Sequence, residues 1–140
     1  IFEHRERVTG KWVYVLDDDD CLTDDSFIEG LKKIDSNNDD IGLIICKGHI
    51  GKSLYPPDGF WKHKLLRGTI RPPNFIVKKE LFLKFADEWV KPRAGDYFFV
   101  EKVYGYTKTY WWNKVVFKAP IGAGIPEINP PIRKNVYSHG

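Results

Sequence analysis

The chain has 140 residues, of which 42% are hydrophobic, and its 22 Lys and Arg slightly outnumber its 19 Asp and Glu. This length predicts a single domain over residues 1–140, with a core large enough to fold without a disulfide or a structural metal. Apolar runs stay well short of the roughly 20 residues of a membrane span, so we expect none. The basic residues are dispersed along the chain, which argues against nucleic acid as a partner.

The two cysteines and the first residue bear on where the protein is found and on whether the sequence is part of a longer one. Cys21 and Cys46 have neither the spacing of a metal site nor the density of a disulfide framework, so we expect reduced thiols in a cytoplasmic protein. The chain begins at Ile1 and contains no Met. We therefore expect a sequence that has been trimmed at its N-terminus or that is part of a longer one.

The first third of the chain predicts two strands and a helix between them. Residues 11–16 form a short β-rich apolar run that stops at four aspartates, which predicts a buried strand leading into a loop. A helix is expected to begin at Thr23 or Asp24, with its apolar residues on one face, and to end at residues 36–40. Residues 41–46 predict a second strand, apolar on both faces as parallel strands tend to be.

The remainder of the chain alternates between irregular and periodic segments. Residues 47–73 are rich in Gly and Pro and lack periodicity, and a stretch of that length is more often functional than decorative. The periodic segments that follow predict strands at 75–77 and 114–118 and helices at 79–86 and 96–104. Residues 119–140 hold four prolines and are expected to lie across the surface. The alternation of strands and helices favours an α/β fold.

Four adjacent carboxylates, Asp17 to Asp20, follow the first predicted strand. Two charges ~5 Å apart at an effective dielectric constant near 20 repel by about 3 kcal/mol, so a cation is expected to neutralise the cluster. Oxygen ligands of this kind prefer Mg²⁺, Mn²⁺ or Ca²⁺ to zinc. The alternative interpretation is a solvated acidic turn that caps the following helix.

The segment from Gly10 to Leu22, GKWVYVLDDDDCL, resembles the strand and Asp-x-Asp signature of family 2-like glycosyltransferases with the GT-A fold. Two later segments, PNFIVKKELF from Pro73 and AGDYFF from Ala94, are similar to that family's second signature. The implied fold is a reduced GT-A-like, Rossmann-related mixed sheet flanked by helices. Such enzymes carry two further βα units before the Asp-x-Asp strand, where this chain has only residues 1–16. A homodimer could cover the sheet edge left by the missing half.

The resemblance also implies roles for individual residues. Asp17 and Asp18 would contact the nucleotide sugar, and Asp17 and Asp19 would bind Mn²⁺ or Mg²⁺, with His139 as a third metal ligand. Asp96 would be the general base that deprotonates the acceptor hydroxyl in an inverting transfer. The alternative for Asp96 is an ordinary helix N-cap.

Cations and aromatic residues in the irregular segment suit the same chemistry. Lys62, Arg67 and Arg71 could bind a diphosphate, and a sugar ring could stack on Trp61. A basic exposed loop is the alternative. The expected donor is a nucleotide-diphosphate sugar, with a UDP-sugar favoured, and the acceptor is a glycan or another hydroxyl.

Two other functions stay open at this point. Residues 13–24 also resemble the strand end of haloacid-dehalogenase-type phosphatases, with Asp96 as a possible later acidic residue, although Cys21 stands where that family has Thr. The aromatic content and the acidic loop are also compatible with a non-catalytic carbohydrate- or metal-binding module.

Overall fold

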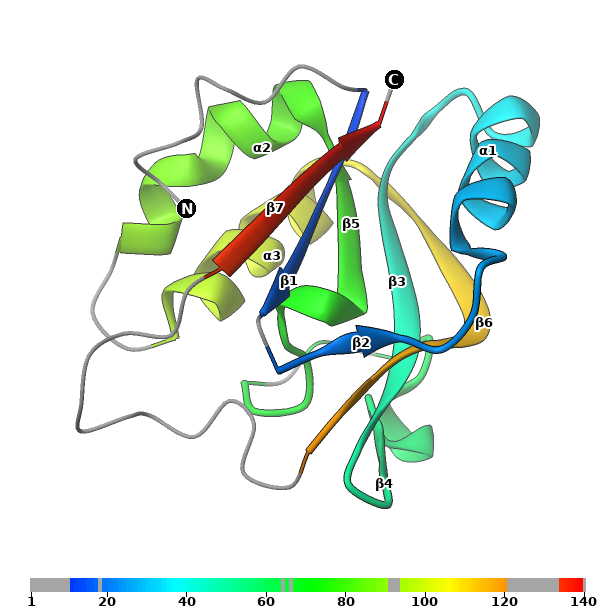
Figure 1. Ribbon diagram of the computed structural model, residues 1–140. Helices are drawn as coiled ribbons and strands as arrows, with labels where there is room; N and C mark the ends of the chain where they lie inside the picture. The colour runs from blue at the N-terminus through cyan, green and yellow to red at the C-terminus, as the bar shows by residue number, and fades with distance from the viewer. Residues whose placement is uncertain are drawn as a thin grey trace.

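The computed structural model describes residues 11–17, 19–63, 65, 67–90, 94–120 and 134–139, and for Asp17 and residues 134–139 it describes the backbone alone. Within this part of the chain, seven strands form one sheet in the order β2–β6–β3–β5–β1–β7, and β4 pairs with β3 (Figure 1). The strands are β1 (Trp12–Asp17), β2 (Cys21–Leu22), β3 (Ile41–Ile50), β4 (Ser53–Tyr55), β5 (Phe75–Lys78), β6 (Lys108–Ala119) and β7 (Lys134–His139). The helices are α1 (Phe27–Asn37), α2 (Lys79–Phe85) and α3 (Gly95–Tyr106), with short 3₁₀ turns η2 (Asp58–Phe60), η3 (Pro72–Asn74) and η4 (Ala86–Val90).

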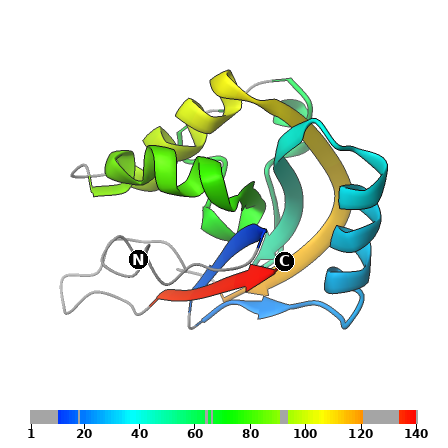
Figure 2. The ribbon, with the colours of Figure 1, turned by 90° about the horizontal axis from the view of Figure 1, so that it is seen from above.

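The sheet is mixed and strongly curved. β3 and β6 run parallel, whereas β1 is antiparallel to both of its neighbours, β5 and β7. Viewed from above, the sheet bends far round, with α1 outside the bend and α2 and α3 on its other face (Figure 2). The predicted α/β class is therefore confirmed, as a mixed sheet covered by helices on both faces.

Alternating side chains of β1 and β3 separate two apolar clusters, one on each face of the sheet. Val13 and Leu43 belong to the cluster beneath α2 and α3, and Tyr14 and Ile44 belong to the cluster beneath α1. Both central strands are buried on both faces, as the apolar runs predict. Only β6 is a parallel neighbour of β3, however, so burial on both faces comes from the two helical layers rather than from an all-parallel sheet.

The α1 helix begins later than predicted because polar groups before it are bonded elsewhere. The Thr23 hydroxyl donates to the carbonyl of Val115 on β6 at 2.8 Å. Asp24 Oδ1 accepts hydrogen bonds from the backbone N–H and the hydroxyl of Ser26, at 2.8 and 2.6 Å. These two bonds, together with a hydrogen bond from Lys114, lower the pKa of Asp24 to about 2. Neither residue caps the helix, which starts at Phe27.

Three segments are more regular than the sequence indicates. The strand predicted at 114–118 begins at Lys108, and the segment 47–73 contains the end of β3 and all of β4. The prediction that residues 119–140 only lie across the surface is wrong for 134–139, which form β7. Because β7 covers the edge of β1, the reason given for a homodimer no longer applies there. Among the described helices, none is long and apolar enough to cross a membrane.

Candidate functional site

The acidic loop after β1 places consecutive carboxylates in different surroundings. Asp19 is exposed, whereas the side chain of Asp20 is wholly buried and its Oδ1 lies 3.7 Å from Nη1 of Arg71. The Arg71 side chain is itself only 11% exposed. The Asp17 side chain and Asp18 lie outside the described residues. The loop is therefore not a uniformly solvated acidic turn, because one of its carboxylates faces an arginine in the interior.

The turn that follows Arg71 is bonded to strands on both sides. Asn74, which has no exposed surface, accepts a hydrogen bond from the backbone N–H of Arg71 at 3.0 Å. Its amide group donates to the carbonyls of Cys46 and Tyr55, both at 3.0 Å. These bonds attach the η3 turn to the middle of β3 and to the last residue of β4. Sequence reasoning missed Asn74, although a polar residue directly before an apolar strand is a signal for such a turn.

Tyr14 joins this buried polar group from β1. Its hydroxyl donates to the carbonyl of Pro73 at 2.8 Å. Burial, reinforced by Cys46 and Asp20, raises the pKa of Tyr14 well above its usual value, against a smaller opposing effect of Arg71. Burial also raises the pKa of the Cys46 thiol, whose Sγ lies 3.4 Å from the same carbonyl. Both groups therefore stay protonated near neutral pH, and Cys46 has none of the thiolate character of a nucleophile.

The predicted diphosphate-binding cations fall into two classes. Lys62, with φ at 64°, and Arg67 are exposed, which fits both a ligand site and the alternative of a basic exposed loop. Arg71 is 9% exposed and faces Asp20. Among the interactions of the described residues, Arg71 contacts the acidic loop, whereas Lys62 and Arg67 do not.

Trp61 is half-buried and already has partners on its ring. The ammonium of Lys47 lies 4.6 Å from the ring centroid, and Trp111 on β6 packs edge-on at 5.0 Å between centroids. Lys47 also lies 4.0 Å from an oxygen of Asp58. Trp61 thus belongs to an aromatic cluster at the margin of the core beneath α3, and a sugar ring would stack on what these partners leave uncovered.

Asp96 lies in the first turn of α3, one residue beyond the start of the helix. The N-cap is Ala94, with φ at 52°, so Asp96 is not the N-cap residue. Its Oδ1 accepts a hydrogen bond from the backbone N–H of Tyr97 at 2.9 Å, and the carboxylate is half-buried at the positive end of the helix. A Cβ at Gly95 would collide with the carbonyl oxygen of Trp89, so only glycine lets the helix start this close to η4.

The segment from Leu65 to Arg71 contacts the first turn of α3 at one end and the acidic loop at the other. The Tyr97 hydroxyl lies 3.4 Å from the carbonyl oxygen of Leu65, and six residues later Arg71 faces Asp20. Six fully extended residues span at most about 22 Å, which bounds the separation of Leu65 and Arg71. Asp96 and the acidic loop therefore lie near opposite ends of one short segment.

The register of β7 bears on the predicted metal ligands. In the antiparallel pairing, His139 lies opposite Trp12 and Lys134 lies opposite Asp17. Asp17 is five residue steps beyond Trp12, which is about 17 Å along β1. Two side chains and a bridging metal ion do not span that distance, so we leave His139 out of the proposed site. Its side chain, like that of Asp17, lies outside the described part of the chain. Among the described residues, no group of three or more His, Cys, Asp or Glu side chains could hold a metal ion.

Neither a protein-family model nor a curated protein sequence matches the chain. The function proposed below therefore depends on the residues and contacts described above.

Proposed function

We propose that the protein is a metal-dependent glycosyltransferase that moves a sugar from a nucleotide-diphosphate sugar to an acceptor hydroxyl, on a reduced GT-A-like fold. The observation that supports it most is the acidic loop directly after the buried strand β1. Asp19 is exposed there, while its neighbour Asp20 is anchored by Arg71. An anchored loop that presents an exposed carboxylate suits the binding of a cation better than a solvated turn does.

The residues present fit a divalent ion that prefers oxygen ligands. Asp17 and Asp19 would hold Mn²⁺ or Mg²⁺, which when bound would clamp the diphosphate and stabilise charge on the leaving group. Asp18, Lys62 and Arg67 would contact the nucleotide sugar, with a UDP-sugar as the favoured donor.

Asp96 is the proposed general base in an inverting transfer. Its carboxylate is half-buried, and one of its oxygens accepts a hydrogen bond from the Tyr97 backbone N–H. That bond fixes the orientation of the carboxylate and leaves its other oxygen to accept a proton from the hydroxyl of a glycan or another acceptor.

A thermal-shift titration tests donor binding, with Mn²⁺ or Mg²⁺ alone and with UDP, GDP, CDP or ADP. A ligand at ~100 times its dissociation constant stabilises a fold by about 2.7 kcal/mol. We expect a metal-dependent shift with one diphosphate, and we expect Asp19→Ala to abolish it. Asp25→Ala is the matched control, because Asp25 is exposed in the turn before α1.

Other outcomes would replace the proposal. A metal-dependent hydrolysis of an aryl phosphate that is lost in Asp17→Asn would indicate a phosphatase. Glycan binding that is indifferent to metal and nucleotide would indicate a non-catalytic carbohydrate-binding module.

Asp96→Asn tests the catalytic role separately. We expect donor binding to stay intact while sugar transfer falls by about 10²- to 10⁴-fold, the usual contribution of a general base. Glu80→Gln is the control, since Glu80 is exposed in the first turn of α2. Unchanged transfer in Asp96→Asn would refute its assignment as the base.

A further inference from the structure

The surroundings of Arg71 suit a residue that supports the acidic loop better than a residue that binds a diphosphate. Its Nη1 lies 3.7 Å from Asp20 Oδ1, and the two side chains are 11% and 0% exposed. Lys62 and Arg67, from the same segment of the chain, are exposed. A guanidinium that is already buried beside a carboxylate has little surface left for a ligand that arrives from solvent.

The backbone that carries Arg71 is held by three strands. Asn74 accepts from the Arg71 backbone N–H and donates to Cys46 on β3 and Tyr55 on β4, while Tyr14 on β1 donates to Pro73. All of these bonds are 2.8 to 3.0 Å long. Arg71 is therefore a fixed cation in the interior, and the acidic loop, which has Asp20 next to the exposed Asp19, is oriented against it.

We propose that Arg71 is a positioning residue, which acts through Asp20 to set the conformation of the loop that presents Asp19 to the metal. The proposal rests on the proposed function and changes the predicted role of Arg71, which no longer contacts the nucleotide sugar. In this arrangement Asp20 is occupied by Arg71, so that Asp19 rather than Asp20 faces the cation. Residues that orient metal ligands in this way typically contribute 10- to 100-fold to metal affinity.

The sign of one measurement separates positioning from simple electrostatics. Removal of a positive charge beside a cation site strengthens the binding of the cation when only charge matters. Removal of a residue that orients the ligands weakens it. We therefore expect Arg71→Gln to bind Mn²⁺ alone 10- to 100-fold more weakly than wild type. Lys52→Gln is the charge-matched control, because Lys52 is exposed at the turn between β3 and β4.

The experiment is a double-mutant cycle on the full chain, with Mn²⁺ binding measured by calorimetry for Arg71→Gln, Asp20→Asn and both changes together. If Arg71 acts through Asp20, the double variant is no weaker than the weaker single variant, since both remove the same interaction. Arg71→Lys, which keeps the charge, should restore part of the affinity. Binding of UDP with saturating Mn²⁺ is measured in parallel.

Amide hydrogen exchange supplies a readout that needs no metal and that separates positioning from a general loss of stability. We expect faster exchange in Arg71→Gln confined to residues 19–22. Acceleration throughout the sheet would instead assign Arg71 a purely structural role and overturn the proposal. Unchanged exchange with weaker UDP binding and unchanged Mn²⁺ affinity would overturn it in favour of direct contact with the diphosphate.

Failure of the proposed function gives a different pattern. If wild type binds no Mn²⁺, the glycosyltransferase proposal falls, and exchange at residues 19–22 still decides whether Arg71 holds the loop. Tighter Mn²⁺ binding by Arg71→Gln would overturn the positioning role while leaving the metal site in place.

Discussion

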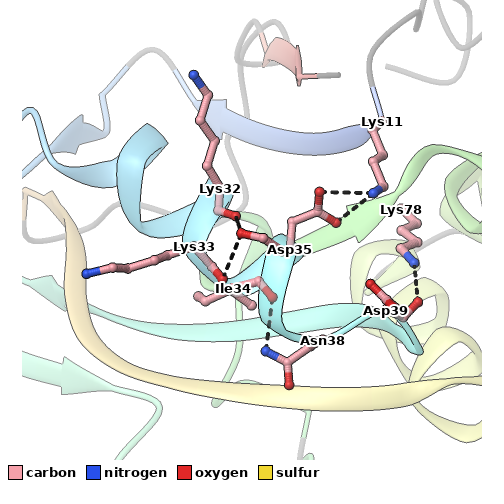
Figure 3. Close-up of polar contacts among 9 residues, drawn as sticks. Lys11, Lys32, Lys33, Ile34, Asp35, Asn38, Asp39 and Lys78 are labelled. Atoms are coloured by element: carbon pink, nitrogen blue, oxygen red, sulfur yellow. Dashed lines mark hydrogen bonds and ion pairs between the residues drawn. The ribbon is translucent and has the colours of Figure 1, made fainter.

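The two ends of β1 are held by polar contacts of opposite kinds. At the amino end, Lys11 Nζ lies 2.8 and 2.9 Å from the two oxygens of Asp35 on α1, and Lys78 Nζ donates to the Asp39 carbonyl at 3.2 Å (Figure 3). The Lys11 side chain is 47% exposed and that of Asp35 is 25% exposed, so water reaches this pair far more than the one at the other end. At the carboxyl end, Asp20 and Arg71 face each other in the interior.

The difference in burial between these two contacts shows which end of β1 holds its side chains in a fixed geometry. Exposed ion pairs contribute about 0–1 kcal/mol, so the amino end is a loose attachment of α1 to the sheet. A buried polar group costs about 1–3 kcal/mol when it loses its partner, so the carboxyl end tolerates few arrangements besides the one observed. A site that must hold ligands in a set geometry is expected at the second kind of end.

The largest effect is expected for Asn74→Ala. The change leaves the carbonyls of Cys46 and Tyr55 and the Arg71 backbone N–H without their partner, and we expect a loss of about 3–5 kcal/mol in the free energy of unfolding. Urea denaturation measures it. The control is Asn38→Ala at the end of α1, where one bond to the Ile34 carbonyl is lost and about 1 kcal/mol is expected. Equal losses of unfolding free energy in the two variants would contradict the contrast drawn between the two ends of β1.

A smaller effect is expected for Tyr14→Phe, about 1–2 kcal/mol, because the Pro73 carbonyl retains the nearby Cys46 thiol. Burial raises the pKa of Tyr14 above that of an unfolded tyrosine. The folded state therefore binds the proton more tightly, and this stability is full below about pH 10 and is lost as the pH rises further. Denaturation followed from about pH 8 to about pH 11 should show a shallower decline in the variant. An identical slope would show that Tyr14 does not carry this linkage.

Asp35→Asn is expected to cost about 1 kcal/mol at neutral pH, because the pair is partly exposed and solvent screens it in part. Burial alone would raise the pKa of Asp35, but hydrogen bonds from Lys11 and Trp12 outweigh it and lower the pKa. The contribution is therefore present above the usual carboxyl pKa of about 3.9 and is lost as the pH falls below it. Stability measured from about pH 7 to about pH 3 should fall less in the variant. Asp39→Asn is the control, because Asp39 takes part through its backbone carbonyl.

The smallest effect is expected for Lys108→Ala. Lys108 and Asp40 form a pair at 3.1 Å with side chains 69% and 65% exposed, so solvent screens it almost completely. The urea midpoint should match that of wild type. A loss as large as that of Tyr14→Phe would mean that surface pairs hold this end of the sheet after all.

Local patterns in the sequence were sufficient for most individual elements. The apolar run before Asp17 predicts β1, the spacing of Phe27, Leu31 and Ile34 predicts α1, and the Gly95–Asp96 pair stands close to the start of α3. Each of these signals depends on residues within one or two turns of each other. The end of β1 was also correctly expected to carry the acidic loop, because an apolar run cannot continue through four carboxylates.

What the sequence by itself determined about this protein is thus most of its elements, the burial of β1, the burial of β3 on both faces, and the position of its acidic run. Only the tertiary structure decided that β7 pairs with β1, which sets His139 opposite Trp12, and that Asp20 turns inward to Arg71. Tyr14 and Pro73 are 59 residues apart, and no local periodicity relates them. Contacts of that range depend on how the sheet curves and which strands become neighbours, and these are settled by packing of the whole core.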